Sequence, residues 1–211
     1  MTAPGRLATA LAVLAVSVAL PFARTPVEPA HPVPTVSFSA VGLSFRYPAT
    51  WRTGTWNDLS SFTALIVYLS TSRLHDPCTV GEKGLTCGDP MGTPLSGGVL
   101  VRWSADGFPG FRLPKPNVTV GGRPALETKT SGGWCASLGG TQTITVTIPR
   151  DIPDNSYQMQ ACLSAPNLPQ QEAQISAMLS TVRIDAGDLC HRQQPAHDRS
   201  YDLTLCRDGE I

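Results

Sequence analysis

Few residues of this chain have the type and spacing that chemistry requires. The sequence contains no Gly-x-Ser-x-Gly, Ser-x-x-Lys or His-Glu-x-x-His, and it has no P-loop or dinucleotide-binding fingerprint. Each of these motifs sets a nucleophile, a metal ion or a phosphate group against the groups that activate or hold it. We therefore predict no catalytic residue.

The chain contains six cysteines, whose thiols are candidate nucleophiles. Catalysis by cysteine needs a free thiolate beside a base, and an even number of cysteines leaves no odd thiol when all are bridged. Many pairings can be drawn, but position along the chain favours two bridges that are short in sequence and a third on or beside predicted strands. The predicted bridges join Cys78 to Cys87, Cys135 to Cys162, and Cys190 to Cys206.

A zinc site is the alternative for part of this set. Cys190, His191, His197 and Cys206 form a mixture of cysteine and histidine close in sequence. Their spacing is unlike that of structural zinc motifs, and no Cys-x-x-Cys occurs. We expect disulfides here, solvated histidines, and no metal or other cofactor.

Aromatic residues mark the segment that most resembles a binding surface. Trp103, Phe108 and Phe111 surround a glycine- and proline-rich stretch, a composition typical of a loop. Aromatic side chains on such a loop can form a ligand shelf or the centre of a protein interface. The alternative is that they only cap the open end of a sheet. We predict an unknown partner protein or a small apolar ligand here.

Two aspartates, Asp151 and Asp154, are close enough in sequence to suggest a general acid and base. They lie in a segment with two prolines and an asparagine. Side-chain oxygens in such segments commonly bond to nearby backbone groups. We therefore interpret this segment as a turn between two strands.

The amino terminus indicates export. Arg6 precedes an apolar run from Leu7 to Ala23, and a proline-rich stretch follows, as in a secretory signal peptide. The run is shorter than the ~20 apolar residues that a spanning helix needs. We predict cleavage after Ala23 and a secreted or extracytoplasmic location. Because Pro21 and Phe22 fit the cleavage rule poorly, an uncleaved amino-terminal anchor is the alternative. Such an anchor would be the sole contact with a membrane.

Composition predicts one folded domain. We expect a signal peptide at residues 1–23, a linker at 24–35, the domain at 36–184, and a disulfide-tied tail at 185–211.

The 16 Lys and Arg residues equal the 16 Asp and Glu residues, and no run of like charge occurs. Nucleic acid is therefore excluded as a partner on electrostatic grounds.

Short apolar stretches between glycines and prolines predict that most of the domain is strand. Thr143–Ile148 alternates threonine with aliphatic residues, which favours a half-buried antiparallel strand. We expect it to form a hairpin with the strand that follows. The candidate strands are Thr35–Ser39, Leu43–Tyr47, Phe62–Ser70, Gly98–Ser104, Pro124–Thr130, Thr143–Ile148 and Tyr157–Ser164.

One amphipathic helix is predicted near the end of the domain. Asn167 could cap it, with Gln170 three residues later in the manner of a capping box, and a last short strand would end near Ile184. The apolar stripe consists of Ile175, Met178, Leu179 and Val182. The predicted fold class is α+β: an antiparallel sheet of about six to seven strands with this helix on one face, stapled by three disulfides.

A motif near the start of the domain resembles a known family. Phe45-x-Tyr47-Pro48-x-x-Trp51 is similar to the opening of PsbP-like domains, and the later layout is similar to LpqN-like exported actinobacterial proteins, which are uncharacterised. This resemblance implies an antiparallel sheet flanked by helices. Since PsbP-like domains serve as assembly factors and binding modules, it is nearly silent on the molecular function.

These observations favour a non-enzymatic extracytoplasmic binding or assembly module of unknown molecular function. Two alternatives remain at this point. One is a cell-envelope hydrolase with an unrecognised active site, and the other is a structural surface protein kept by an uncleaved anchor.

Overall fold

The computed structural model describes residues 33–56, 62–81 and 84–185. The predicted signal peptide, most of the linker, the tail after Asp185 and the bridge Cys190–Cys206 lie outside these residues. Within them the chain is mostly antiparallel sheet with one α-helix, so the α+β class is confirmed.

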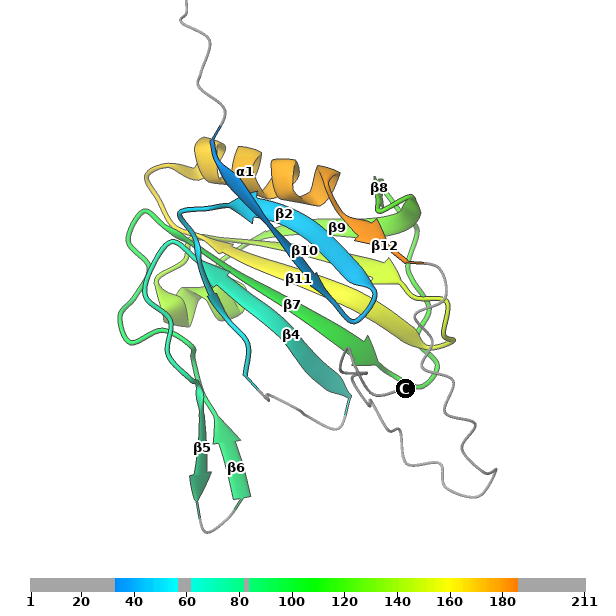
Figure 1. Cartoon of the computed structure of the whole chain (residues 1–211), viewed down its shortest axis with the longest axis horizontal. Coiled ribbons are helices and arrows are strands. Elements are labelled where there is room, and N and C mark those ends of the chain that lie inside the picture. Colours follow the sequence, from blue (N-terminus) through cyan, green and yellow to red (C-terminus); the bar gives the residue numbers. More distant parts are fainter. Residues whose placement is uncertain (1–32, 57–61, 82–83, 186–211) are drawn as a thin grey trace, which may run out of the picture. The chain divides into compact units, whose positions relative to one another are not determined.

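A seven-stranded antiparallel sheet forms one layer (Figure 1). Its central strands, β7 and β11, pair along their whole lengths, and β11 forms the predicted hairpin with β10. In spatial order the strands are β3 (Arg52–Gly54), β4 (Thr63–Ser70), β7 (Val99–Gly107), β11 (Asn155–Leu163), β10 (Gln142–Pro149), β9 (Arg123–Ser131) and β8 (Val118–Val120).

A second layer combines a small sheet with the helix. The small sheet has the order β1 (Thr35–Ala40), β2 (Leu43–Pro48) and β12 (Arg183–Ile184), and the helix is α1 (Leu168–Ser180). The expectation of a single sheet was wrong, although every predicted strand exists. Alternation along a strand shows which side chains are buried but does not show which strand lies beside it.

The two layers enclose the main hydrophobic core. Phe45 of β2 stacks on Trp103 of β7 with ring centroids 5.3 Å apart, and Phe38 of β1 also stacks on Phe45, at 5.2 Å. Tyr47 and Trp51 are buried in the same cluster, so the Phe45-to-Trp51 motif is core. The helix residues in this cluster are Ile175, Met178 and Leu179, with Val182 just after the helix.

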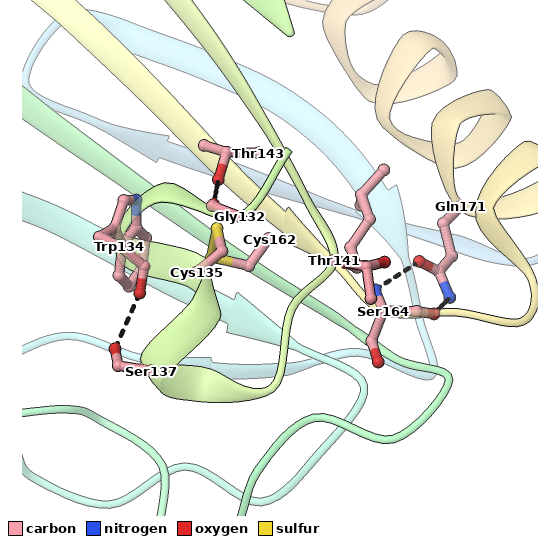
Figure 2. The surroundings of a disulfide bond; sticks show 10 residues. Gly132, Trp134, Cys135, Ser137, Thr141, Thr143, Cys162, Ser164 and Gln171 are labelled. Carbon is pink, nitrogen blue, oxygen red and sulfur yellow. Dashed lines mark hydrogen bonds between the residues drawn. A yellow bond between two sulfur atoms is a disulfide. The ribbon is translucent and has the colours of Figure 1, made fainter. Parts of the chain in front are cut away.

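The opposite face of the large sheet carries a smaller apolar cluster. It includes Leu100 and Leu138 together with both cysteines of the Cys135–Cys162 disulfide, whose surroundings are shown in Figure 2. This bond joins the 3-10 helix η1 (Gly133–Leu138) to β11, as predicted. The Thr143 hydroxyl donates a hydrogen bond to the Gly132 carbonyl, which holds the start of η1 against β10.

The start of α1 is fixed by a different residue from the one expected. Asn167 makes no side-chain capping bond; its φ of −95° and ψ of 34° lie outside the extended region that capping uses. Gln171 instead is buried and accepts a hydrogen bond from Ser164 N–H at 3.1 Å. Its amide donates to the Ser164 carbonyl at 2.8 Å, so α1 is tied to the end of β11 (Figure 2).

The second disulfide lies in a separate hairpin. Cys78 and Cys87 are directly opposite each other in β5 (Cys78–Gly81) and β6 (Gly84–Cys87), and they are bonded as predicted. These two strands form a two-stranded sheet of their own.

The two bridges should differ in their effect on stability. Replacing Cys135 and Cys162 with Ala should lower the free energy of unfolding by about 3–4 kcal/mol, because the bond closes a long loop between core elements. Replacing Cys78 and Cys87 with Ala should leave the main transition nearly unchanged. Urea unfolding under oxidising conditions measures both, and equal losses would mean that the hairpin folds as one unit with the core.

Candidate functional site

The three predicted aromatic residues do not form one surface. Trp103 lies within β7 and is fully buried against Phe45, so its assignment to a binding loop was wrong. Phe111 is half-buried. Phe108 is 46% exposed and follows the end of β7 directly.

Phe108 stacks on an aromatic residue that was not among the predicted site residues. Its ring stacks on Phe62 with centroids 5.5 Å apart, and Phe62 is 40% exposed. The Gly107 N–H donates to the Phe62 carbonyl at 2.8 Å, and the Phe108 N–H donates to the Asp154 carbonyl at 3.0 Å. The pairing of β4 with β7 thus creates an exposed aromatic pair from residues distant in sequence.

The two turn aspartates form ion pairs with different arginines. Arg123 binds Asp151 with both of its terminal nitrogens, and this hydrogen bonding lowers the pKa of the carboxyl. Arg112 binds Asp154 at 2.9 Å. Because each carboxylate has its own arginine, the two do not form an acid–base pair.

One carboxyl group is buried on the face of the large sheet opposite the main core. Asp106 of β7 is 4% exposed and lies across from Thr63 of β4 and Ser156 of β11. Burial raises its pKa, although hydrogen bonds with Ser104 and Thr63 oppose the change. Its Oδ1 has no hydrogen-bond partner among the described residues.

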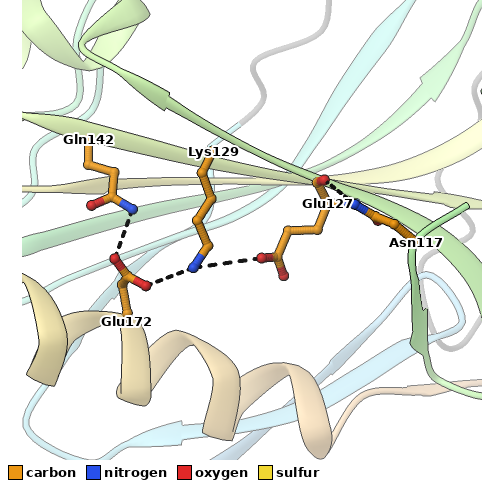
Figure 3. A network of polar contacts seen from close by, with 5 residues as sticks. All are labelled: Asn117, Glu127, Lys129, Gln142 and Glu172. Carbon is orange, nitrogen blue, oxygen red and sulfur yellow. Dashed lines mark hydrogen bonds and ion pairs between the residues drawn. The ribbon is translucent and has the colours of Figure 1, made fainter.

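A polar network ties one side of α1 to the large sheet (Figure 3). Lys129 of β9 binds Glu172 of α1 at 2.7 Å and lies 3.9 Å from Glu127. The Gln142 amide donates to the other oxygen of Glu172 at 2.9 Å. These contacts lower the pKa of Glu172, first through the bond from Lys129.

An open groove of about 570 Å³ lies between α1 and β2. Small residues of the helix, Ala173 and Ala177, line it one turn apart and are exposed. Tyr47 and Pro48 of β2 line the facing side, and Met178 lines the helix side. Alanines four positions apart lie on one helix face, so these two short side chains leave space between α1 and β2.

One edge of the groove is held by hydrogen bonds of the Thr181 hydroxyl. The Arg46 N–H donates to the Thr181 hydroxyl at 2.8 Å, and that hydroxyl donates to the Met178 carbonyl at 2.7 Å. Val33, just before β1, also lines the groove and is 57% exposed. Such a concave, largely apolar site is the usual form of a small-molecule site.

Comparisons with known proteins gave no match to this chain. No family model matches it, and no curated protein or solved structure is significantly similar to it. Among the described residues no group of three or more His, Cys, Asp or Glu side chains could hold a metal ion. None of the helices in the described part has the length and apolar character needed to cross a membrane.

Trp103 and Phe108 should respond differently to truncation. Trp103→Ala should lower the free energy of unfolding by about 3–5 kcal/mol, because it leaves a large cavity between the layers. Phe108→Ala should cost about 1 kcal/mol or less, because it removes one exposed stacking partner. Chemical denaturation measures both, and a loss at Phe108 as large as that at Trp103 would place Phe108 in the core.

Asp106→Asn should make the protein more stable at pH 7. The raised pKa means that the folded state holds its proton more tightly than the unfolded state does, so stability falls as pH rises from about 3.9 through the folded pKa. The asparagine side chain does not ionise, so the variant does not lose stability in this way. Its higher stability relative to the wild type should vanish at pH values below the ordinary carboxyl pKa.

Denaturation at several pH values measures this effect, with exposed Asp89→Asn as the control for loss of a negative charge. A less stable Asp106→Asn protein at pH 7 would show that the hydrogen bonds from Ser104 and Thr63 outweigh the desolvation.

Proposed function

We propose that this chain is an exported, non-enzymatic binding module whose groove between α1 and β2 takes a small apolar ligand. The groove itself carries the proposal. Its volume of about 570 Å³ lies within the roughly 300–1,000 Å³ range of small-molecule sites, and its alanine, proline and methionine walls favour apolar contact.

The disulfides support an extracytoplasmic location for the protein. Two bonds formed by four cysteines indicate an oxidising environment outside the cytosol. We extend this to export by a signal peptide cleaved after Ala23, and to a third bridge, Cys190–Cys206, that holds the tail. In the same proposal α1 is the carboxy-terminal helix packed on one face of the fold.

Kinship with PsbP-like and LpqN-like proteins is part of this proposal. It is supported by the motif residues, because Phe45, Tyr47 and Trp51 are all buried in the core. A motif used for packing carries information on fold, so the kinship adds nothing on which ligand is bound.

A partner protein is the second candidate, and the Phe62–Phe108 pair favours it. Two exposed, stacked aromatic rings are the kind of group that protein interfaces use as anchors. Binding of such a partner would be lost in Phe108→Ala and kept in variants of the groove.

The groove proposal is tested by filling the groove from the helix. Fluorescence of the neutral apolar probe N-phenyl-1-naphthylamine should rise on binding the wild-type protein and should not rise with Ala177→Trp, whose indole occupies the space. Ser176→Trp is the matched control, because Ser176 is exposed on the same helix and does not line the groove. No response from the wild type, or equal responses from both variants, would contradict the proposal.

A further inference from the structure

The groove has a cation at its edge. Arg46 lines it, is exposed, and makes no ion pair with another described residue. Its backbone is held on two sides, by the pairing with Ser37 in β1 and by the bond to the Thr181 hydroxyl. The backbone of Arg46 is therefore fixed beside the groove, while its guanidinium remains available to a ligand.

Among the described residues, no negatively charged side chain lines the groove beside this cation. The residues that line it include no aspartate or glutamate. The acidic residue of α1, Glu172, is bound by Lys129 and Gln142 in the network of Figure 3. An anion that entered the groove would meet Arg46 without competition from a lining carboxylate.

The remaining walls favour a hydrocarbon chain. Pro48, Ala173, Ala177 and Met178 offer apolar surface along the groove, and the glutamines that line it are uncharged. An apolar groove with one cation at its edge is complementary to a molecule with an apolar body and one anionic end. A guanidinium can bind both oxygens of a carboxylate, which suits a carboxylate head.

We propose that the groove binds a single-chain amphiphile with a carboxylate head, its chain against α1 and its carboxylate on Arg46. This inference rests on the proposed function, because it names the class of ligand for the same groove. Arg46 is exposed, so the ion pair contributes selectivity, and the apolar walls contribute most of the affinity.

The test compares three ligands of equal chain length in displacing N-phenyl-1-naphthylamine: dodecanoate, 1-dodecanol and dodecyltrimethylammonium, each below its aggregation concentration. The wild-type protein should bind dodecanoate roughly threefold to tenfold more tightly than dodecanol. It should bind the cation most weakly. The preference for dodecanoate should fall as salt is added, because salt screens exposed charges.

Arg46→Gln should bind dodecanoate and dodecanol equally, whereas Arg183→Gln should keep the preference. Arg183 is exposed on β12 of the same small sheet and does not line the groove. Circular dichroism shows whether both variants keep the wild-type fold.

The outcomes separate this inference from the function on which it rests. Equal binding of dodecanoate and dodecanol by the wild type, or a preference that survives Arg46→Gln, would overturn the carboxylate and leave an apolar site. Failure of all three ligands to displace the probe would show that the groove does not bind single-chain amphiphiles. Failure of the probe itself to bind would remove the proposed function. Displacement by acetate alone would also overturn the inference, because it would make the groove an anion site.

Discussion

The stack of Phe45 on Trp103 is the contact on which the arrangement of this fold depends. It joins β2 of the small sheet to β7 near the centre of the large sheet, and both side chains are almost completely removed from water. Burial of two such rings is among the largest apolar gains that a chain of this size can make. Since β2 is held face to face with the large sheet, α1 can reach the core only beside β2. The groove forms along that line of contact.

The helix is held by three different kinds of contact. Its apolar side belongs to the main core, Gln171 ties its first turn to Ser164, and Glu172 is bound to Lys129 of β9. The groove lies along another side, where Ala173 and Ala177 are too small to reach β2. The same network that fixes the helix also occupies its carboxylate, which explains why the charge lining the groove is positive.

The opposite face of the large sheet has a different character. At one end the Cys135–Cys162 bond and its apolar neighbours cover the strands, whereas Asp106 is buried toward the other end with its pKa raised. A buried carboxyl group without full hydrogen bonding weakens a fold unless it remains protonated. Stability in this protein therefore comes mainly from the core between the layers, and the second face adds a covalent restraint.

The sequence by itself determined the local features of this protein. Short apolar stretches between glycines and prolines, the apolar stripe of α1 and the positions of four cysteines were enough to predict the strands, the helix, two bridges and the α+β class. Local periodicity reports burial, and these elements are local. Tertiary structure alone decided that β1 and β2 leave the large sheet, that Trp103 is core, and that Phe62 meets Phe108. The groove is likewise absent from any sequence pattern, because its walls come from β2 and α1, more than a hundred residues apart in sequence. Its apolar lining and its single cation follow from how two layers pack, and packing joins residues that no spacing rule connects.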